Sequence, residues 1–252
     1  MLAVIGGTGL YDPGFLAGAK EQVIETPYGE ASVIIGEGPQ GSVAFMARHG
    51  RGHSLPPHRI NYRANIWALG SLGVAGILAT AAVGSLRREL PPGSFLLLDQ
   101  FIDFTKTRIS TFAEEGVVHL DFTRPYCPRL GGYLLEAARR LGMDLQDRGC
   151  YVCTEGPRYE TPAEVKMFAH LGGDVVGMTN VPEVVLAREL GICYATVAVV
   201  TNYGAGIAPV PLSHDEVGSV MGRNAQGLRR LLQMTMEIVP PGEGACCGKG
   251  DG

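Results

Sequence analysis

Short apolar runs alternate with segments of helical periodicity along the chain, and this alternation restricts the folds that the chain can adopt. Runs typical of buried strands lie at residues 2–5, 76–82, 95–99 and 193–200. Parallel strands cannot be joined by a tight turn, so helical segments between them are expected to serve as crossovers. The pattern therefore predicts an α/β fold with a mixed, largely parallel central sheet that is flanked by helices.

Several helix starts are marked by N-cap residues. Thr161-Pro-Ala-Glu164 and Ser213-His-Asp-Glu216 have the spacing of capping boxes, and Thr179 precedes a helix that is expected to begin near Pro182. The other predicted elements are two helices, at residues 59–72 and 131–141, and an antiparallel pair of strands, at residues 31–35 and 43–47.

No repeat and no linker interrupts residues 1–239, so we expect one domain there. Residues 240–252 are rich in glycine and have little apolar surface to bury, which predicts a flexible tail. The six cysteines, in a chain without an apparent export signal, are expected to be reduced thiols. Cys150-Tyr-Val-Cys153 has redox-motif spacing, but it lies in a strand-like run rather than at a helix start, which favours structural thiols.

Charge and hydropathy exclude two classes of partner. Lys and Arg number 21 against 25 Asp and Glu, so the chain has no basic stripe for a nucleic acid. Its apolar runs are much shorter than the ~20 residues of a membrane span, and a cytoplasmic location is expected. Glycine is abundant, at 36 of 252 residues, which predicts many tight turns or close approaches of the backbone to another group.

Gly6-Gly7-Thr8-Gly9 follows the first predicted strand and is a candidate anion loop. Free N–H groups and a hydroxyl at the carboxyl end of a strand can bind an oxyanion. The loop completes neither the dinucleotide fingerprint nor the Walker pattern. By itself it therefore leaves a plain tight turn and an anion contact as alternatives.

Arg48 to His53 form a second candidate, because cationic and hydrogen-bonding side chains stand among glycines directly after a strand. Phosphate suits such a set, since Arg offers a planar fork of donors. His49, His53 and His58 also suggest a metal, but prolines and glycines break any helix there and no nearby carboxylate completes a ligand set. The pattern favours an anion site over a metal site or a solvated loop.

Glu160 and Asn202 form a third candidate, each placed after a predicted strand. A carboxylate and an uncharged amide present acceptor and donor groups to a planar heterocycle. Either residue alone is more often a turn former. Their significance depends on the complete set of motifs.

Six ordered motifs make up that set: Ile5-Gly-Gly-Thr-Gly-Leu10, Ala47-Arg-His-Gly-Arg51, Asn61-Tyr-Arg-Ala-Asn65, Glu155-Gly-Pro-Arg-Tyr-Glu-Thr161, Gly177-Met-Thr-Asn-Val-Pro-Glu183 and Thr201-Asn-Tyr203. Their order and spacing resemble the trimeric purine nucleoside phosphorylase and methylthioadenosine phosphorylase family, over about residues 2–236. The resemblance implies an enzyme, a pentosyltransferase of purine salvage, in which phosphate attacks the anomeric carbon of a purine nucleoside. It implies a homotrimer, a nucleoside and phosphate as partners, and no metal or organic cofactor.

The resemblance also assigns residues. It implies phosphate binding by Thr8, Arg48, His49, the backbone of Ala81 and Ala82, and Thr179. It places Met178 under the ribose, Tyr159 against the base, and Tyr203 and Gly204 beside the substrate. The implied catalytic residues are His49, Glu160 and Asn202: Asn202 donates to the N7/O6 edge of the purine, and Glu160 accepts from its N1–H.

Three positions bear on substrate choice. Adenine-selective members carry Asp at the positions of Asn202 and Gly204 and a small residue at that of Glu160, so the resemblance implies a 6-oxopurine base, as in inosine or guanosine. It further implies that His214 binds the ribose 5′-hydroxyl, with a solvated first-turn residue as the alternative. Methylthioinosine or methylthioadenosine phosphorolysis stays open, and a Rossmann-type nucleotide-binding protein is the alternative of another class.

Overall fold

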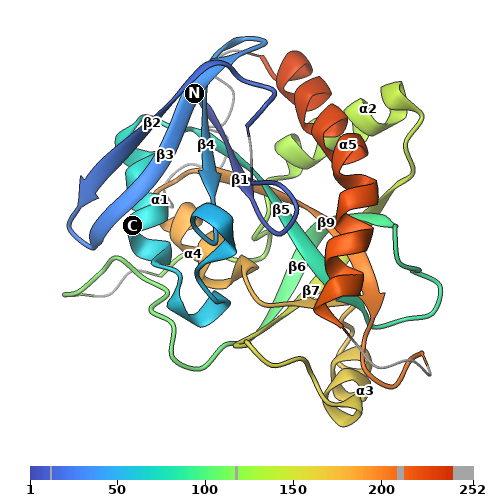
Figure 1. Cartoon of the computed structure of the whole chain (residues 1–252). Coiled ribbons are helices and arrows are strands. Elements are labelled where there is room, and N and C mark those ends of the chain that lie inside the picture. The colour runs from blue at the N-terminus through green and yellow to red at the C-terminus, as the bar shows by residue number, and fades with distance from the viewer. Residues whose placement is uncertain (12, 117–118, 209–212, 241–252) are drawn as a thin grey trace.

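A nine-stranded mixed sheet organises the computed structural model, which describes residues 1–11, 13–116, 119–208 and 213–240. The strands of that sheet are β1 (Leu2–Gly6), β2 (Ala17–Thr26), β3 (Gly29–Gly38), β4 (Gly41–Ala47), β5 (Gly76–Ser85), β6 (Phe95–Phe104), β7 (Leu145–Thr154), β8 (Val175–Gly177) and β9 (Cys193–Tyr203). The helices in the described residues are α1 (Tyr62–Ser71), α2 (Pro128–Leu141), α3 (Pro162–His170), α4 (Asn180–Glu189) and α5 (His214–Ile238), as Figure 1 shows.

The sheet has the strand order β2-β3-β4-β1-β5-β8-β7-β6-β9, and β9 also pairs with β5. Five of these nine strand pairings are parallel. Because β9 pairs with both β5 and β6, strands β5, β8, β7, β6 and β9 close into a ring. The predicted single-domain α/β class with a mixed, largely parallel sheet is confirmed, but the ring closure was not anticipated.

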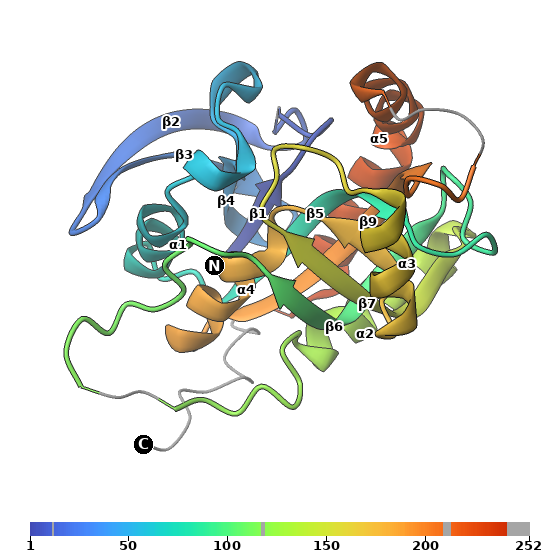
Figure 2. The same cartoon turned by 90° about the horizontal axis from the view of Figure 1, so that it is seen from below.

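Two apolar layers lie on opposite faces of the sheet. Alternate residues of β5 separate between them: Ile77 and Ala79 join the layer that includes α1 and α4, and Leu78 joins the layer that includes α2 and α5. Figures 1 and 2 show the two pairs of helices on different sides of the strands. This separation follows from the two-residue period of a strand, whose successive side chains point to opposite faces.

The N-cap residues predicted from the sequence lie at the observed starts of helices. Thr161 and Glu164 form a reciprocal capping box at α3, and the Ser213 side chain accepts from the backbone N–H of Glu216 at α5. In α4, Val181 has non-helical backbone angles, so regular helix begins at Pro182 as predicted. The helix predicted at 59–72 occupies Tyr62–Ser71, with Asn61 as its N-cap.

Strands β2 and β8 were not predicted. Strand β2 is largely exposed along its length, so it carries no apolar alternation to reveal it. The excursion at β3 and β4 is antiparallel as predicted, and β4 then pairs in parallel with β1. The four described cysteines are free thiols, and Cys153 is fully buried. The predicted tail lies outside the described residues from residue 241 onward.

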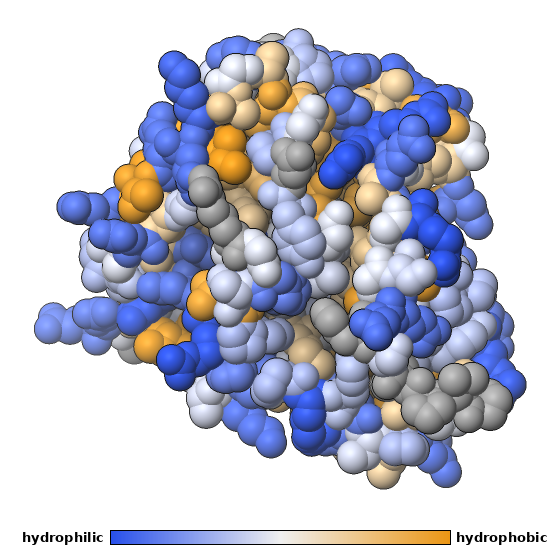
Figure 3. Space-filling model, viewed as in Figure 1, coloured by the Kyte–Doolittle hydropathy of each residue, from blue (hydrophilic) through white to orange (hydrophobic). Residues whose placement is uncertain are grey.

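No helix among the described residues is long and apolar enough to cross a membrane. Figure 3 shows one face of the molecule, which is covered mainly by hydrophilic side chains with hydrophobic ones in smaller groups. Such a distribution is ordinary for a protein surface, where scattered apolar residues need no partner.

Candidate active site

A cavity of about 470 Å³ lies where the ends of several strands meet. The parallel strands β1, β4, β5 and β9 end at one edge of the sheet, and β8 runs antiparallel along the end of β5. Ten of the residues predicted from sequence line the cavity: Thr8, Arg48, His49, Ala81, Ala82, Tyr159, Glu160, Met178, Thr179 and Asn202. Residues more than 190 positions apart in the sequence therefore share one cavity.

The first loop is held against β5. The backbone N–H of Gly7 donates to the Thr80 hydroxyl over 3.0 Å, and a Cβ at Gly7 would lie 2.8 Å from both the Thr80 carbonyl oxygen and the Arg48 guanidinium. Only glycine fits this approach without displacement of the backbone or of Arg48. Thr8, the next residue, consequently lies at the cavity wall.

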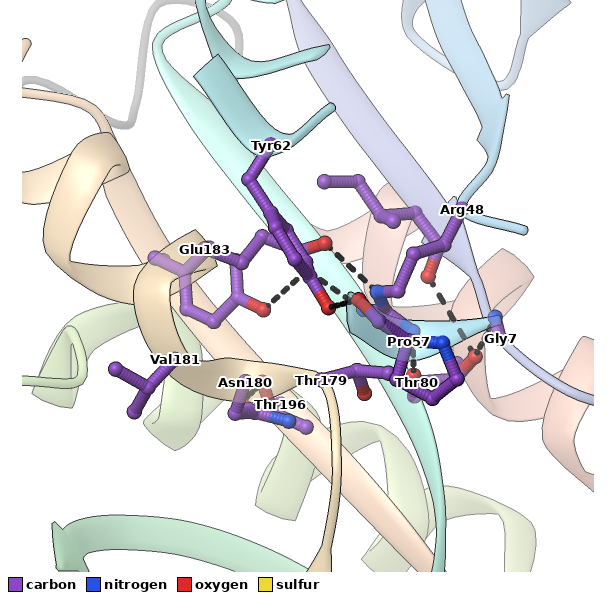
Figure 4. Close-up of polar contacts among 12 residues, drawn as sticks. Gly7, Arg48, Pro57, Tyr62, Thr80, Thr179, Asn180, Val181, Glu183 and Thr196 are labelled. Carbon is purple, nitrogen blue, oxygen red and sulfur yellow. Dashed lines mark hydrogen bonds and ion pairs between the residues drawn. The ribbon is translucent and has the colours of Figure 1, made fainter. Parts of the chain in front are cut away.

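Arg48 is fully buried and bound to a partner that sequence reasoning missed. Its Nε and Nη2 donate to the two carboxylate oxygens of Glu183 over 2.7 and 2.6 Å, and its Nη1 donates to the Thr80 carbonyl over 2.7 Å (Figure 4). The Tyr194 hydroxyl donates to the same carboxylate over 2.5 Å. Three of the five guanidinium N–H groups are thus used, which leaves two without one of these partners.

His49 has a defined tautomer and an unusual environment. Its Nδ1 lies 2.9 Å from the Leu55 carbonyl oxygen, which can only accept, so Nδ1 carries a proton. Its ring stacks on His53, with centroids 4.2 Å apart. Burial, together with the charge of Arg48, lowers the pKa of His49 to about 4 despite the opposing hydrogen bond to Leu55. The ring is therefore neutral near pH 7, with Nε2 as an acceptor.

Thr179 is the N-cap residue of α4, but its side chain makes no capping hydrogen bond. Its backbone N–H donates to the Tyr151 hydroxyl over 3.0 Å. The Thr179 side chain is buried and lines the same cavity as Arg48, and Figure 4 draws both residues. Arg48, His49 and Thr179 therefore bring a cation, an imidazole and a hydroxyl to this cavity, together with a helix start that favours anions.

Glu160 and Asn202 line the same cavity and are both buried. Thr154 donates from its hydroxyl to one carboxylate oxygen of Glu160 over 2.8 Å. Burial raises the pKa of Glu160, and the Thr154 hydrogen bond opposes that rise. The other oxygen of Glu160 is left for a donor in the cavity.

Asn202 is the penultimate residue of strand β9. The sequence predicted instead that Asn202 follows the end of the strand. Its carbonyl accepts from the Thr201 hydroxyl over 2.8 Å, and its amide donates to the Tyr203 carbonyl over 2.9 Å. An amide group has two N–H donors, so one stays available. Glu160 and Asn202 thus offer an acceptor and a donor to the same space.

Two other predicted residues do not line the cavity, and the side chain of a third lies outside the described residues. Tyr203 is absent from the cavity wall and donates from its hydroxyl to the Arg88 carbonyl. Gly204 packs so closely that a Cβ would lie 3.0 Å from the Ser85 carbonyl oxygen. His214 begins α5, but its side chain lies outside the described residues; Val217, on the same helix, lines the cavity.

Sequence reasoning missed several wall residues that carry no polar signal: Pro56, Pro57, Val83, Val176 and Val217. His58 does not line the cavity, and the described residues contain no group of three or more His, Cys, Asp or Glu that could hold a metal ion. The alternative of a histidine metal site therefore has no support among those residues. The geometry instead gathers Arg48, His49 and Thr179 in one cavity with Glu160 and Asn202.

This fold and this site define a nucleoside phosphorylase-like α/β protein. Residues 1–236 match the model of the Phosphorylase superfamily, and the chain belongs to that family. The resemblance seen in the sequence motifs is thereby confirmed.

Individual relatives carry more specific names. The chain is 55% identical over 98% of its length to a probable 6-oxopurine nucleoside phosphorylase of Dictyoglomus turgidum, of which it covers 94%. It is 52% identical over 95% of its length to the 6-oxopurine nucleoside phosphorylase of Pyrococcus furiosus, of which it covers 93%. A probable S-methyl-5′-thioinosine phosphorylase of Methanopyrus kandleri is 48% identical over 98% of this chain and 96% of that protein.

Among solved structures, methylthioadenosine phosphorylase from Schistosoma mansoni in complex with adenine is similar, with a TM-score of 0.89. That enzyme is 34% identical, and the match covers 93% of this chain and 90% of the other.

The Arg48–Glu183 pair generates a stability prediction. Glu183→Gln leaves a fully buried guanidinium without its carboxylate, so the free energy of unfolding should fall by about 3 kcal/mol or more. Glu136→Gln, which removes two exposed ion pairs on α2, is the matched control and should change little. Urea unfolding of both variants measures the difference, and equal stabilities would contradict the structural role of Glu183.

His49 generates a pH prediction. The unfolded histidine titrates near pH 6.5 and the folded one near 4, so the unfolded state binds more protons between these values. The contribution of His49 to the free energy of unfolding is therefore complete above about pH 6.5 and is lost as the pH falls toward about 4. His49→Gln should lose less unfolding free energy than the wild type between about pH 7.5 and about pH 5. Urea unfolding at both values checks this, and identical losses would refute it.

Proposed function

We propose that this chain catalyses the phosphorolysis of 6-oxopurine nucleosides such as inosine and guanosine, with release of the free base and ribose 1-phosphate. The observation that carries the proposal is a single cavity that is lined by Arg48, His49 and Thr179 and also by Glu160 and Asn202. We place phosphate beside the first three residues, the base beside the other two, and the sugar between phosphate and base. The names of the two most similar relatives reported above support the same reaction.

On the anion side, phosphate is assigned to Thr8, Arg48, His49, Thr179 and the backbone of Ala81 and Ala82. The two N–H groups of Arg48 that face no protein partner and the free N–H groups of the cavity wall donate to its oxygens. His49 offers Nε2, which can accept from a protonated phosphate oxygen when the ring is neutral or donate when the dianion has raised its pKa. The burial of the site strengthens each of these contacts.

Catalysis then depends on where charge develops. A phosphate oxygen attacks the anomeric carbon, the bond to the base breaks, and its electron pair moves into the purine. The bound phosphate stabilises the cation-like sugar, which we place over Met178. The free N–H of Asn202 donates to the N7/O6 edge as negative charge gathers there. His49, Glu160 and Asn202 are the proposed catalytic residues, and their contribution is positioning and electrostatics.

The choice of base follows from Glu160. Its free carboxylate oxygen accepts from the N1–H of a 6-oxopurine, whereas N1 of a 6-aminopurine is itself an acceptor. Two acceptors in one buried contact leave both unpaired, and such a mismatch can reduce kcat/KM by a factor of ~10⁴. Tyr159, at the cavity wall and half-exposed, is assigned to pack on the base.

The 5′ side carries a second candidate function. We assign His214 to the ribose 5′-hydroxyl, as in a 6-oxopurine enzyme. Val217, on the same helix as His214, lines the cavity. Pro56 and Pro57 also line it, and these three apolar residues suit a methylthio substituent. Phosphorolysis of S-methyl-5′-thioinosine is therefore the alternative, and the Methanopyrus kandleri relative bears that name.

Further parts of the proposal concern the working enzyme. We propose that phosphate is a co-substrate and that no metal or organic cofactor takes part. The enzyme is proposed to be a homotrimer of the cytoplasm that serves purine salvage. Sedimentation measures the oligomeric mass directly.

The proposed function predicts a ranking of initial rates among nucleosides. Inosine and guanosine should be cleaved only when phosphate is supplied, and adenosine should react poorly because of its mismatch with Glu160. Initial rates with inosine, guanosine, adenosine, methylthioinosine and methylthioadenosine, each with and without phosphate, test this order. Preference for either 6-amino substrate would overturn the assignment of the base, and preference for methylthioinosine would favour the second candidate.

Asn202→Asp tests the donor role. Replacing the amide by a carboxylate removes the N–H that faces the base, so kcat/KM for inosine should fall by about a hundredfold or more. Asn224→Asp, at a half-buried position of helix α5 that does not line the cavity, is the matched amide control and should keep the wild-type rate. An unchanged inosine rate in Asn202→Asp would contradict the proposed role.

A further inference from the structure

The segment formed by residues 105–112 crosses the ends of strands β7 and β8 without helix or strand of its own. Arg108 in this segment is nearly buried, with a side chain that is 3% exposed. It does not line the cavity. Its position is therefore unexplained by any direct contact with a substrate.

The Arg108 guanidinium contacts backbone carbonyl groups rather than side chains for the most part. It donates to four such oxygens, those of Thr154 at 3.3 Å, Glu155 at 2.7 Å, Met178 at 2.7 Å and Val181 at 2.7 Å. It also donates to the Tyr62 hydroxyl at 3.2 Å and lies 3.4 Å from the Glu155 carboxylate.

The Glu155 side chain also binds segment 105–112. Its carboxylate accepts from the backbone N–H groups of Lys106 and Thr107, over 2.5 and 3.3 Å, and from the Thr107 hydroxyl over 3.2 Å. Both the backbone carbonyl and the carboxylate of Glu155 thus accept hydrogen bonds from segment 105–112. The contacts fix the position of Arg108 relative to the strand ends.

The four carbonyl groups lie on two stretches of backbone, and each stretch includes residues that line the cavity. Thr154 and Glu155 begin the stretch that ends at Glu160, on the side proposed for the base. Met178 and Val181 enclose Thr179, on the side proposed for phosphate. One guanidinium therefore connects the backbones of both walls.

The chemistry of this contact requires arginine. A guanidinium holds five N–H donors in one plane, whereas a lysine ammonium is a compact charge with three. Without the guanidinium, four carbonyl groups near the protein interior lose a donor, and the two backbones lose their common anchor. Small displacements of catalytic groups can cost large factors in rate.

We propose that Arg108 is a positioning residue, which sets the separation of the base-binding and phosphate-binding walls through their backbone carbonyl groups. The proposal rests on the function proposed above and adds a residue that touches neither substrate. Loss of Arg108 should move both walls, so it should weaken the binding of both substrates together. A residue of one wall, such as Glu160, should affect the nucleoside alone.

The experiment compares Arg108→Ala and Arg108→Lys with the wild type in steady-state kinetics, below the melting temperature of each variant. Arg108→Ala should raise the KM for inosine and the KM for phosphate, each by about tenfold or more, and lower kcat. Arg108→Lys should show the same pattern to a smaller extent and decides the question if the alanine variant does not fold. Millimolar guanidinium should restore part of the loss in Arg108→Ala.

Two controls separate positioning from general stability. Arg63→Ala removes another arginine that holds the same region, through Glu114 and the Tyr28 ring, but contacts neither wall. It should leave both KM values unchanged and show no response to guanidinium. Glu160→Gln should raise the KM for inosine alone.

The outcomes are distinct. A joint rise of both KM values with recovery by guanidinium supports the proposal. Both KM values within twofold of wild type in the folded Arg108 variants, or a lower melting temperature as the only change, would overturn it. A wild-type enzyme that cleaves no purine nucleoside overturns the proposed function instead, before any variant is compared.

Discussion

The buried pair of Arg48 and Glu183 is the interaction on which the rest of the site depends. Burying two charges costs several kcal/mol per ion, and here bidentate geometry, the Tyr194 hydroxyl and the Thr80 carbonyl offset that cost. The pair connects the end of β4 with helix α4, and Tyr194 and Thr80 add strands β9 and β5. Four elements that border the cavity are thereby held in one arrangement.

The sheet topology determines which groups can face each other. Strand β9 pairs with β5 on one side and with β6 on the other, so the strands from β5 to β9 form a closed ring. Closure brings the segments after β7 and β8 over the ends of β5 and β9. An open parallel sheet would place those segments along a line, so Glu160 and Thr179 would not line one cavity.

Each polar side chain of the site is oriented by a neighbour that uses part of its hydrogen-bonding capacity. Thr154 occupies one oxygen of Glu160, Thr201 occupies the carbonyl of Asn202, and Leu55 occupies Nδ1 of His49. The remaining acceptor or donor is then directed at the cavity. Such orientation reduces the reorganisation needed when substrate charge develops.

The sequence by itself determined the alternation of strands and helices, the caps at Thr161 and Ser213, and the candidate residues on loops, because these signals depend on neighbouring residues. The tertiary structure alone decided the partner of Arg48, which lies 135 positions away, the ring closure by β9, and the anchoring of both walls by Arg108. It also showed that Gly204 packs against Ser85 rather than lining the cavity. These contacts join segments that are distant in the chain, so no local pattern of residues could specify them.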